Sequence, residues 1–169
     1  MSSMAVAVKT PLLSSRVVAA RPADMGIVRM LFREYEKSVS AGAAQCFAGF
    51  EQELAGLPGD CTPPAGGILL VRDQTGDALG VVAFHQVEPG VAEIKRLYLR
   101  PGNRGRRLGK QLMTAALRAC AAAGARTVRL STVPSVMRVA DTMYQTMGFR
   151  PIPAYPGAGC GARCYETSL

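Results

Sequence analysis

Several features that identify common protein classes are absent from this chain of 169 residues. It contains no apolar run near the ~20 residues of a membrane-spanning helix, and Lys9 interrupts the apolar stretch near the N-terminus, which argues against a secretory signal. The five cysteines show no CxxC spacing, and the single histidine, His85, cannot complete a His-containing metal set with them. We therefore predict no metal site and reduced thiols in a cytosol-like, cytoplasmic compartment.

The first 16 residues contain Ser, Lys and Arg but no acidic residue. We interpret residues 1–16 as a flexible N-terminal extension, with an organellar targeting segment as the alternative. Residues 17–169 suit one domain, because a hydrophobic content of 49% supplies a sizeable core.

Acidic residues are also absent between Ile94 and Ala140, a stretch that contains eleven Lys and Arg residues in a chain of net charge +8. The positive potential is not neutralised locally, so a polyanionic ligand or a nucleic acid would be attracted. Single-stranded nucleic-acid binders usually interleave stacking aromatic residues with the charge, yet Tyr98 is the only aromatic residue between Gln86 and Val139. The sequence thus ranks nucleic acid last among the partners, and a plain solvated basic surface is the simplest alternative.

The apolar periodicity predicts both helices and strands along the chain. We expect strands at Val17–Ala20, Ile68–Arg72, Leu79–Gln86, Val91–Leu99, Thr127–Val133, Phe149–Ile152 and Ala162–Thr167. We expect helices that begin after Asp24, that cover about Ala43–Ala55, that run from Leu108 to a stop at Gly124, and that run from about Ser135 to Met147. This order predicts an α/β fold in which a mixed, mostly antiparallel sheet carries helices on both faces.

A Gly- and Arg-rich turn joins the strand Val91–Leu99 to the long helix that follows. Arg100, Arg104, Arg106 and Arg107 surround this turn, and Gly105 and Gly109 would let an anion approach the backbone. A helix N-terminus presents unpaired N–H groups and the positive end of the helix dipole. The turn is therefore a candidate anion site.

These segments, from about Val17 to Leu169, resemble the GCN5-related N-acetyltransferase (GNAT) superfamily. The family's Q/R-x-x-G-x-G/A pyrophosphate motif maps onto Arg104, Gly105, Arg106, Arg107, Leu108 and Gly109, with Arg107 where the family usually has its first glycine. The segment ADTMYQTMGF at Ala140–Phe149 is similar to the family's A-x-x-φ-Y-x-x-x-G-F ending, where φ is apolar. The segment AEIKRLYL at Ala92–Leu99 places Glu93 where histone acetyltransferases of the superfamily have a catalytic carboxylate.

The resemblance implies an acyl-CoA N-acyltransferase fold with acetyl-CoA as cosubstrate. It implies that the backbone of Leu97, Tyr98 and Leu99 runs beside the pantetheine arm and that Arg104–Lys110 wraps the pyrophosphate. If the backbone at Arg107 needed a positive φ, arginine would be costly there; in the first turn of a helix it would not be, and its guanidinium could add a phosphate contact. Despite this departure, we still expect the motif to bind. Met137 replaces an asparagine that is often found three residues before the alanine of the last motif, which removes one expected polar contact.

The expected chemistry needs a base, because an alkyl amine with a pKa near 10.4 is mostly protonated at neutral pH. Between Ala78 and Ala140 the only carboxylates are Glu88, in a Pro-Gly turn, and Glu93. We predict that Glu93 is the general base, although it could instead be a surface residue paired with Lys95 or an arginine. The resemblance implies that Tyr144 protonates the departing thiolate and that backbone N–H groups near Leu97 hold the oxyanion, whereas Tyr144 could instead be a core residue.

The sequence thus predicts an N-acetyltransferase that moves acetyl from acetyl-CoA directly to a primary amine of a small molecule or peptide. The alternatives are a non-catalytic acyl-CoA sensor or interaction module and, last, a basic nucleic-acid-binding domain. His85 is left out of the predicted site as a structural residue. The acceptor and any homodimer stay open.

Overall fold

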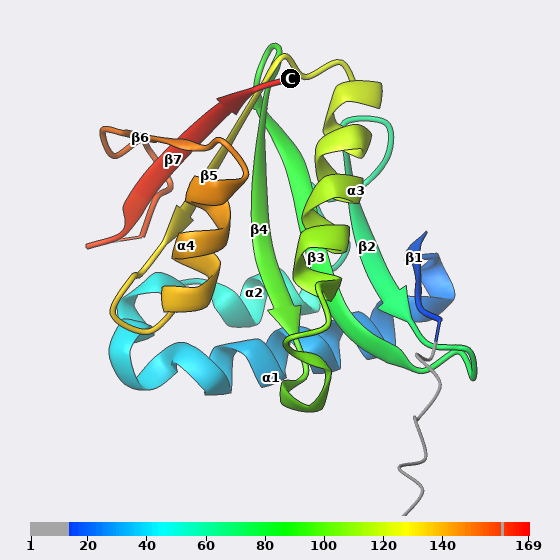
Figure 1. The fold of residues 1–169 in the computed structure, drawn as a ribbon. Coiled ribbons are helices and arrows are strands. Elements are labelled where there is room, and N and C mark those ends of the chain that lie inside the picture. The colour runs from blue at the N-terminus through cyan, green and yellow to red at the C-terminus, as the bar shows by residue number, and fades with distance from the viewer. Residues whose placement is uncertain (1–13, 160) are drawn as a thin grey trace, which may run out of the picture.

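Residues 14–159 and 161–169 are described by a computed structural model, and the side chains of residues 45 and 46 lie outside this description (Figure 1). One seven-stranded sheet has the order β1-β2-β3-β4-β5-β7-β6. Its strands are β1 (Arg16–Ala19), β2 (Gly66–Arg72), β3 (Ala78–Glu88), β4 (Val91–Leu99), β5 (Thr127–Thr132), β6 (Arg150–Ile152) and β7 (Arg163–Ser168). All neighbouring strands are antiparallel except β4 and β5, which are parallel.

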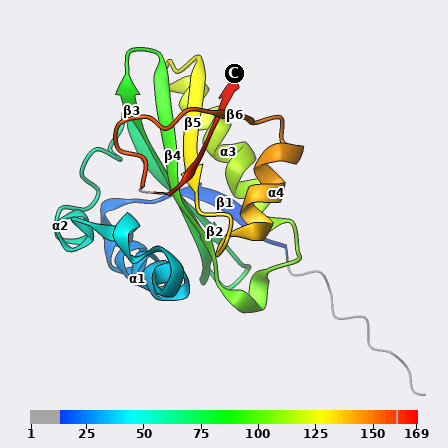
Figure 2. The same cartoon turned by 90° about the vertical axis from the view of Figure 1, so that its left-hand side faces the viewer.

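The helices cover both faces of this sheet, as Figure 2 shows from the side. They are α1 (Met25–Ala43), α2 (Phe50–Ala55), α3 (Leu108–Ala122) and α4 (Arg138–Thr146), with short 3-10 helices at Pro22–Asp24, Ala44–Phe47 and Pro101–Asn103. One core cluster joins α1 and α2 to the sheet through residues such as Leu31, Phe50 and Val81. The other joins α3 and α4 to the opposite face through residues such as Leu112, Tyr144 and Val128. The predicted mixed sheet with helices on both faces is confirmed.

Two predicted helices differ from those in the structure. The expected continuous helix over Ala43–Ala55 is wrong, because the backbone is left-handed at Gly49, with φ +76°, and this separates the 3-10 helix from α2. Glycine adopts this conformation without a steric cost, so it divides what the apolar pattern suggested was one helix. The helix expected from Ser135 begins instead at Arg138, because Val133 accepts the amides of Val136 and Met137 in a preceding turn.

The described residues include only part of the predicted N-terminal extension and the side chains of three of the five cysteines. Residues 1–13 of the predicted extension and Cys160 lie outside the described residues, as does the side chain of Cys46. Strand β1 begins at Arg16, one residue before the expected start. Cys61, Cys120 and Cys164 are buried free thiols, and burial raises the pKa of Cys61 to about 11 and that of Cys120 to about 12.

Strands β4 and β5 pair over a short seam and then diverge. Their register covers Val91–Glu93 of β4 and Thr127–Arg129 of β5, and Glu93 is the last paired residue of β4. Figure 1 shows the two strands together at the upper end of the sheet and apart at the lower end. The fork leaves one side of each strand without a strand partner and opens the sheet at Glu93.

A β-bulge in β4 sits just beyond the fork. Val81 pairs with Tyr98 and Ala83 with Lys95, so β4 contains one residue more than β3 in this interval, and Arg96 has φ +59°. The extra residue changes the alternation of side chains along β4. As a result, Tyr98 packs in the cluster with α1, whereas Leu97 and Leu99 pack against the cluster with α3.

Candidate active site

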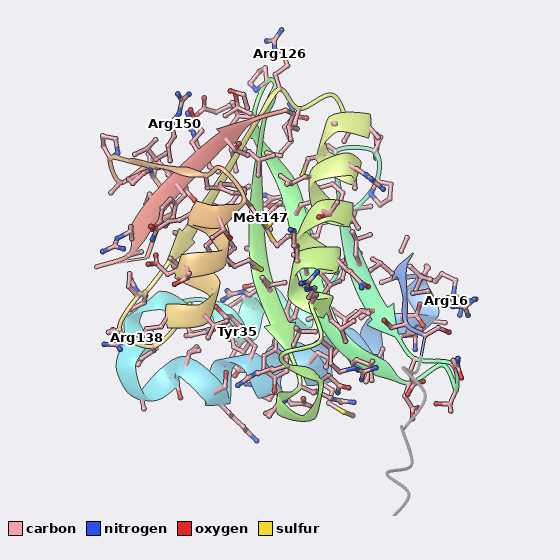
Figure 3. All side chains as sticks on the ribbon, in the orientation of Figure 1. Arg16, Tyr35, Arg126, Arg138, Met147 and Arg150 are labelled. Atoms are coloured by element: carbon pink, nitrogen blue, oxygen red, sulfur yellow. The ribbon has the colours of Figure 1, made fainter. Side chains whose placement is uncertain are left out.

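A cavity of about 420 Å³ lies where β4 and β5 diverge. Its wall is formed by both strands, by α1, α2 and the 3-10 helix between them, and by the segment before β7. The lining residues include Tyr35, Phe47, Glu53, Glu93, Lys95, Arg96 and Met137. The Tyr35 hydroxyl lies 3.8 Å from the sulfur of Met137, and Figure 3 shows Tyr35 near the lower end of α4.

Glu93 lines this cavity, and among the described residues its ion-pair partner is His85 rather than Lys95 or an arginine. Nε2 of His85 lies 3.1 Å from Oε1 of Glu93, and the two residues are register partners on β3 and β4. Both side chains are mostly buried, at 16% and 15% exposed. His85, which the sequence analysis set aside as structural, is therefore part of the site.

Tyr155 approaches Glu93 from the segment between β6 and β7. Its hydroxyl is buried and lies close enough to the side chains of Glu93 and Ser131 for both to affect its pKa. Burial, and next the charge of Glu93, raise the pKa of Tyr155 well above its ordinary value. The guanidinium of Arg129 lies over its ring, 5.8 Å from the centroid. The carboxylate thus has polar neighbours from β3 and from the C-terminal part of the chain.

Tyr144, on α4, is buried in the core, and its side chain is not among those that line the cavity. The residue is 6% exposed, and its ring packs against Phe149 at 5.9 Å and Tyr165 at 6.3 Å between centroids. Burial above all, and then the electrostatic influence of Tyr35 and Asp141, raise the pKa of Tyr144 strongly. The phenol therefore stays protonated through the neutral range, which is the form that a proton donor needs.

The Gly- and Arg-rich turn ends at the first residue of α3. The first backbone bond into the helix runs from the Gln111 amide to the Arg107 carbonyl. In the described part of the chain, the amides of Gly105 and Arg107 have no backbone acceptor. Among the side chains, Arg104 Nε donates to the Leu99 carbonyl at 3.2 Å and Arg106 Nη1 donates to Asn103 Oδ1 at 3.1 Å. The turn thus presents amides and positive charge together, as an anion site requires.

Of the two backbone conformations considered for Arg107, the structure has the one that is costly for arginine. Arg107 is the residue before α3 and has φ +60° and ψ +15°, which is left-handed, and Gly105 has φ +75°. The position where the GNAT motif usually has its first glycine therefore does need a positive φ. For an L-residue with a Cβ atom this conformation costs on the order of 1 kcal/mol.

We accordingly predict that Arg107→Gly stabilises the free protein by about 1 kcal/mol and raises Tm by about 2–4 °C. Thermal unfolding followed by circular dichroism measures this effect. Arg106→Gly is the matched control, because Arg106 has no positive φ, and it should give no increase. An equal increase in both variants would show that loss of positive charge, not backbone strain, is responsible.

Strand β4, α3 and α4 come together at Gly109. A Cβ atom at this position would lie 3.5 Å from Leu99 Cδ1 and 3.7 Å from Met143 Sδ, which are ordinary contact distances. Leu97 and Leu99 are partly buried on the same side of β4. Met137 accepts a hydrogen bond on its sulfur from Thr132 Oγ1 at 3.3 Å, so it packs between β5 and α1.

Within residues 14–159 and 161–169, no group of three or more His, Cys, Asp or Glu side chains could hold a metal ion. In the same part of the chain, no helix combines the length and apolar character needed to cross a membrane.

The sheet that forks at a bulged strand, followed by an amide-rich turn into a helix, defines an acyl-CoA N-acyltransferase fold. Comparison with known proteins agrees with this class. The family model described as "Acetyltransferase (GNAT) family" matches residues 26–149. The chain therefore belongs to the acetyltransferase (GNAT) family, and the prediction of an acetyl-CoA-dependent acetyltransferase is confirmed.

A named relative and two solved structures illustrate the similarity. The chain is 34% identical over 135 residues to an uncharacterised N-acetyltransferase of Schizosaccharomyces pombe. The aligned region covers 79% of this chain and 81% of the relative. The PaiA N-acetyltransferase of Thermoplasma acidophilum, solved in complex with coenzyme A, has a TM-score of 0.73 at 16% identity. The superposition covers 93% of this chain and 100% of the PaiA chain. The yncA protein of Salmonella typhimurium, solved with acetyl-CoA, has a TM-score of 0.65 at 14% identity and covers 92% and 94%.

Proposed function

We propose that this protein transfers the acetyl group of acetyl-CoA directly to a primary amine of a small molecule or peptide. The observation that carries the proposal is the fork of the sheet, which has a carboxylate, Glu93, at the last paired residue of β4 and an open cavity beyond it. The titles of two structures with the same fold name coenzyme A and acetyl-CoA, which supports the choice of donor.

The residues around the turn fit the phosphate groups of the donor. The amides at the start of α3 and the side chains of Arg104, Arg106, Arg107 and Lys110 would hold the pyrophosphate, assisted by the helix dipole. The backbone of Leu97, Tyr98 and Leu99, on the unpaired side of β4, would hold the pantetheine arm. The thioester of the bound donor supplies the activated acetyl group.

Glu93 would take the proton of the acceptor ammonium. Freeing an amine of pKa near 10.4 at pH 7 costs roughly 4–5 kcal/mol, so a base at this position assists the reaction substantially. His85 would orient this carboxylate through its contact with Oε1 of Glu93. The acceptor nitrogen would then attack the thioester carbonyl, and the carbon–sulfur bond would break.

Two further groups would complete the transfer. Backbone N–H groups at the bulge, near Arg96 and Leu97, would stabilise the oxyanion. Tyr144 would donate its proton to the thiolate that leaves, so that the free thiol and the acetylated amine are the products. The raised pKa of Tyr144 supports its presence as the protonated acid.

The proposal is tested by incubating the purified protein with acetyl-CoA and panels of amines and peptides, while free thiol is followed. We expect thiol release that depends on an acceptor. Tight acetyl-CoA binding in calorimetry without turnover on any amine would contradict the proposal and favour a non-catalytic acyl-CoA sensor.

Substitutions of Gly109 test whether acetyl-CoA binds at the start of α3. We predict that Gly109→Ala and Gly109→Val lower acetyl-CoA affinity at least about 10-fold, because a side chain blocks the approach of the pyrophosphate to the backbone. Gly109→Ala should leave the free fold intact, since the new Cβ atom meets its neighbours at ordinary distances and Ala is favoured over Gly in a helix.

Calorimetry measures the affinity, and thermal unfolding measures the stability. Gly102→Ala is the matched control, because a Cβ atom at Gly102 meets nothing within 4 Å and its φ is not positive. Unchanged affinity in the Gly109 variants would place the phosphate groups elsewhere.

A further inference from the structure

The cavity side of β4 carries opposite charges two residues apart. Glu93 and Lys95 both line the cavity, and they precede the bulge, so they follow the ordinary alternation of a strand. Two residues of strand span about 6.6 Å. An acceptor bound along this part of β4 therefore meets a carboxylate at one end and an ammonium group at the other.

The ammonium group of Lys95 is only partly neutralised. Glu53 of α2 lies 3.2 Å from Lys95 Nζ, but the same carboxylate binds Arg96 through two contacts of 2.6 and 3.2 Å. One negative charge is thus shared by two positive charges. Burial opposes ionisation of Glu53, yet Arg96 and Lys95 outweigh it and leave the pKa of Glu53 lowered, so the carboxylate stays charged.

Arg96 has less freedom than Lys95 to meet an acceptor. Its guanidinium lies over the rings of Phe47 and Phe50, 5.0 and 5.1 Å from their centroids, and is bound to Glu53 on its edge. The Lys95 side chain is 31% exposed, against 15% for Arg96. Lys95 is therefore the cation that a ligand in the cavity can reach.

Part of the cavity wall is apolar. Tyr35, Phe47 and Met137 contribute to it, and the rings of Tyr35 and Phe47 pack edge to face at 5.7 Å. A polyamine would place a second ammonium group beside Lys95 and Arg96, which is unfavourable. A peptide N-terminus would offer only a neutral amide to Lys95.

We infer that the acceptor is an amine that carries its own carboxylate, as a free amino acid does. This inference rests on the proposed function and specifies its substrate class. The amine lies at Glu93, the carboxylate binds Lys95, and the remainder of the molecule packs on the apolar wall. Lys95 is thus a specificity residue, and Glu53 positions it.

Three matched acceptors test the inference: leucine, leucinamide and 3-methylbutylamine. They share the branched side chain and differ in carrying a carboxylate, a neutral amide or neither. We expect kcat/KM for leucine to exceed that for each of the others by about 10- to 100-fold, the usual value of a hydrogen bond to a charged group. The lower amine pKa of leucinamide, near 8, gives it more free amine at neutral pH, so basicity cannot produce this order.

Substitution of Lys95 tests whether this residue binds the carboxylate of the acceptor. Lys95→Gln should reduce the leucine-to-leucinamide ratio by about 10-fold or more, and Lys95→Arg should retain most of the ratio because it keeps the positive charge. Lys37→Gln, on an exposed residue of α1, is the matched control and should leave the ratio unchanged. Thermal unfolding of each variant shows whether loss of the contact between residue 95 and Glu53 of α2 lowers the stability of the fold.

The outcomes separate the inference from the proposed function. Turnover with leucinamide or 3-methylbutylamine equal to that with leucine overturns the inference while the N-acetyltransferase stands. A leucine preference that persists in Lys95→Gln overturns the role of Lys95. Absence of acceptor-dependent thiol release from all three amines and from the wider panel would overturn the proposed function itself.

Discussion

Glu93→Gln should lower kcat/KM by roughly 10²–10⁴-fold near pH 7, once an acceptor is in hand. Glutamine keeps the shape of the side chain and can still accept from His85, but it cannot take a proton. The loss should be largest at low pH and should shrink as the pH approaches the amine pKa, because free amine then forms without a base. A pH profile of kcat/KM for both proteins measures the effect.

Glu88→Gln is the matched control for this prediction. Glu88 lies at the end of the same hairpin, pairs with Arg129 and is 60% exposed, so it should change neither the rate nor the pH profile. Glu93→Gln with the rate of the unmodified protein, when chemistry limits turnover, would exclude Glu93 as the base. Positioning and backbone polarisation would then supply the catalysis.

Tyr144→Phe should reduce kcat by roughly 10²–10⁴-fold while acetyl-CoA affinity stays nearly constant, because only the proton donor is lost. Burial holds the pKa of Tyr144 far above neutrality, so the phenol is protonated throughout the working range. The loss should therefore be almost independent of pH between about 6 and 9, in contrast to that of Glu93→Gln. Single-turnover kinetics over this range distinguish the two variants.

Tyr165→Phe is the matched control for Tyr144→Phe. It removes a hydroxyl from the ring that packs beside Tyr144 and should affect the stability of the fold but not the chemical step. Tyr165 donates a 2.7 Å hydrogen bond to buried Asp141, so this change should cost about 1–3 kcal/mol of stability and little of kcat. If Tyr144→Phe behaved in the same way, with reduced Tm and full turnover, Tyr144 would be a core residue only.

The element pattern and the fold could be predicted because they depend on apolar periodicity and on local signals. The apolar runs of β2 and β3 and the apolar face of α3 are buried. Glycine marked the end of α3 correctly, at Gly124, but Gly49 was missed inside a stretch that is otherwise helical in character. The missed break shows that apolar spacing over a short window does not distinguish one helix from two.

The contact of Glu93 with His85 could not be predicted, because it depends on a bulge. Counting outward from the Pro89–Gly90 turn would place Gln86 opposite Glu93. A register irregularity between Gln86 and Glu88 shifts the partner to His85 and turns the imidazole to the same side as the carboxylate. The left-handed backbone at Arg107 could not be decided from the sequence, because the arginine that stands in place of the motif's glycine does not indicate which of the two conformations it adopts.

The short seam between β4 and β5 also bears on how the molecule stays folded. Three register pairs join the two halves of the sheet, so a molecule bound in the fork to both strands would act as a clamp between them. Ligand that binds only the folded chain adds about 2.7 kcal/mol to stability at a concentration 100 times its Kd. If the donor occupies the fork, the lifetime of this protein in a cell would then follow the local supply of acetyl-CoA, independently of whether any amine is present.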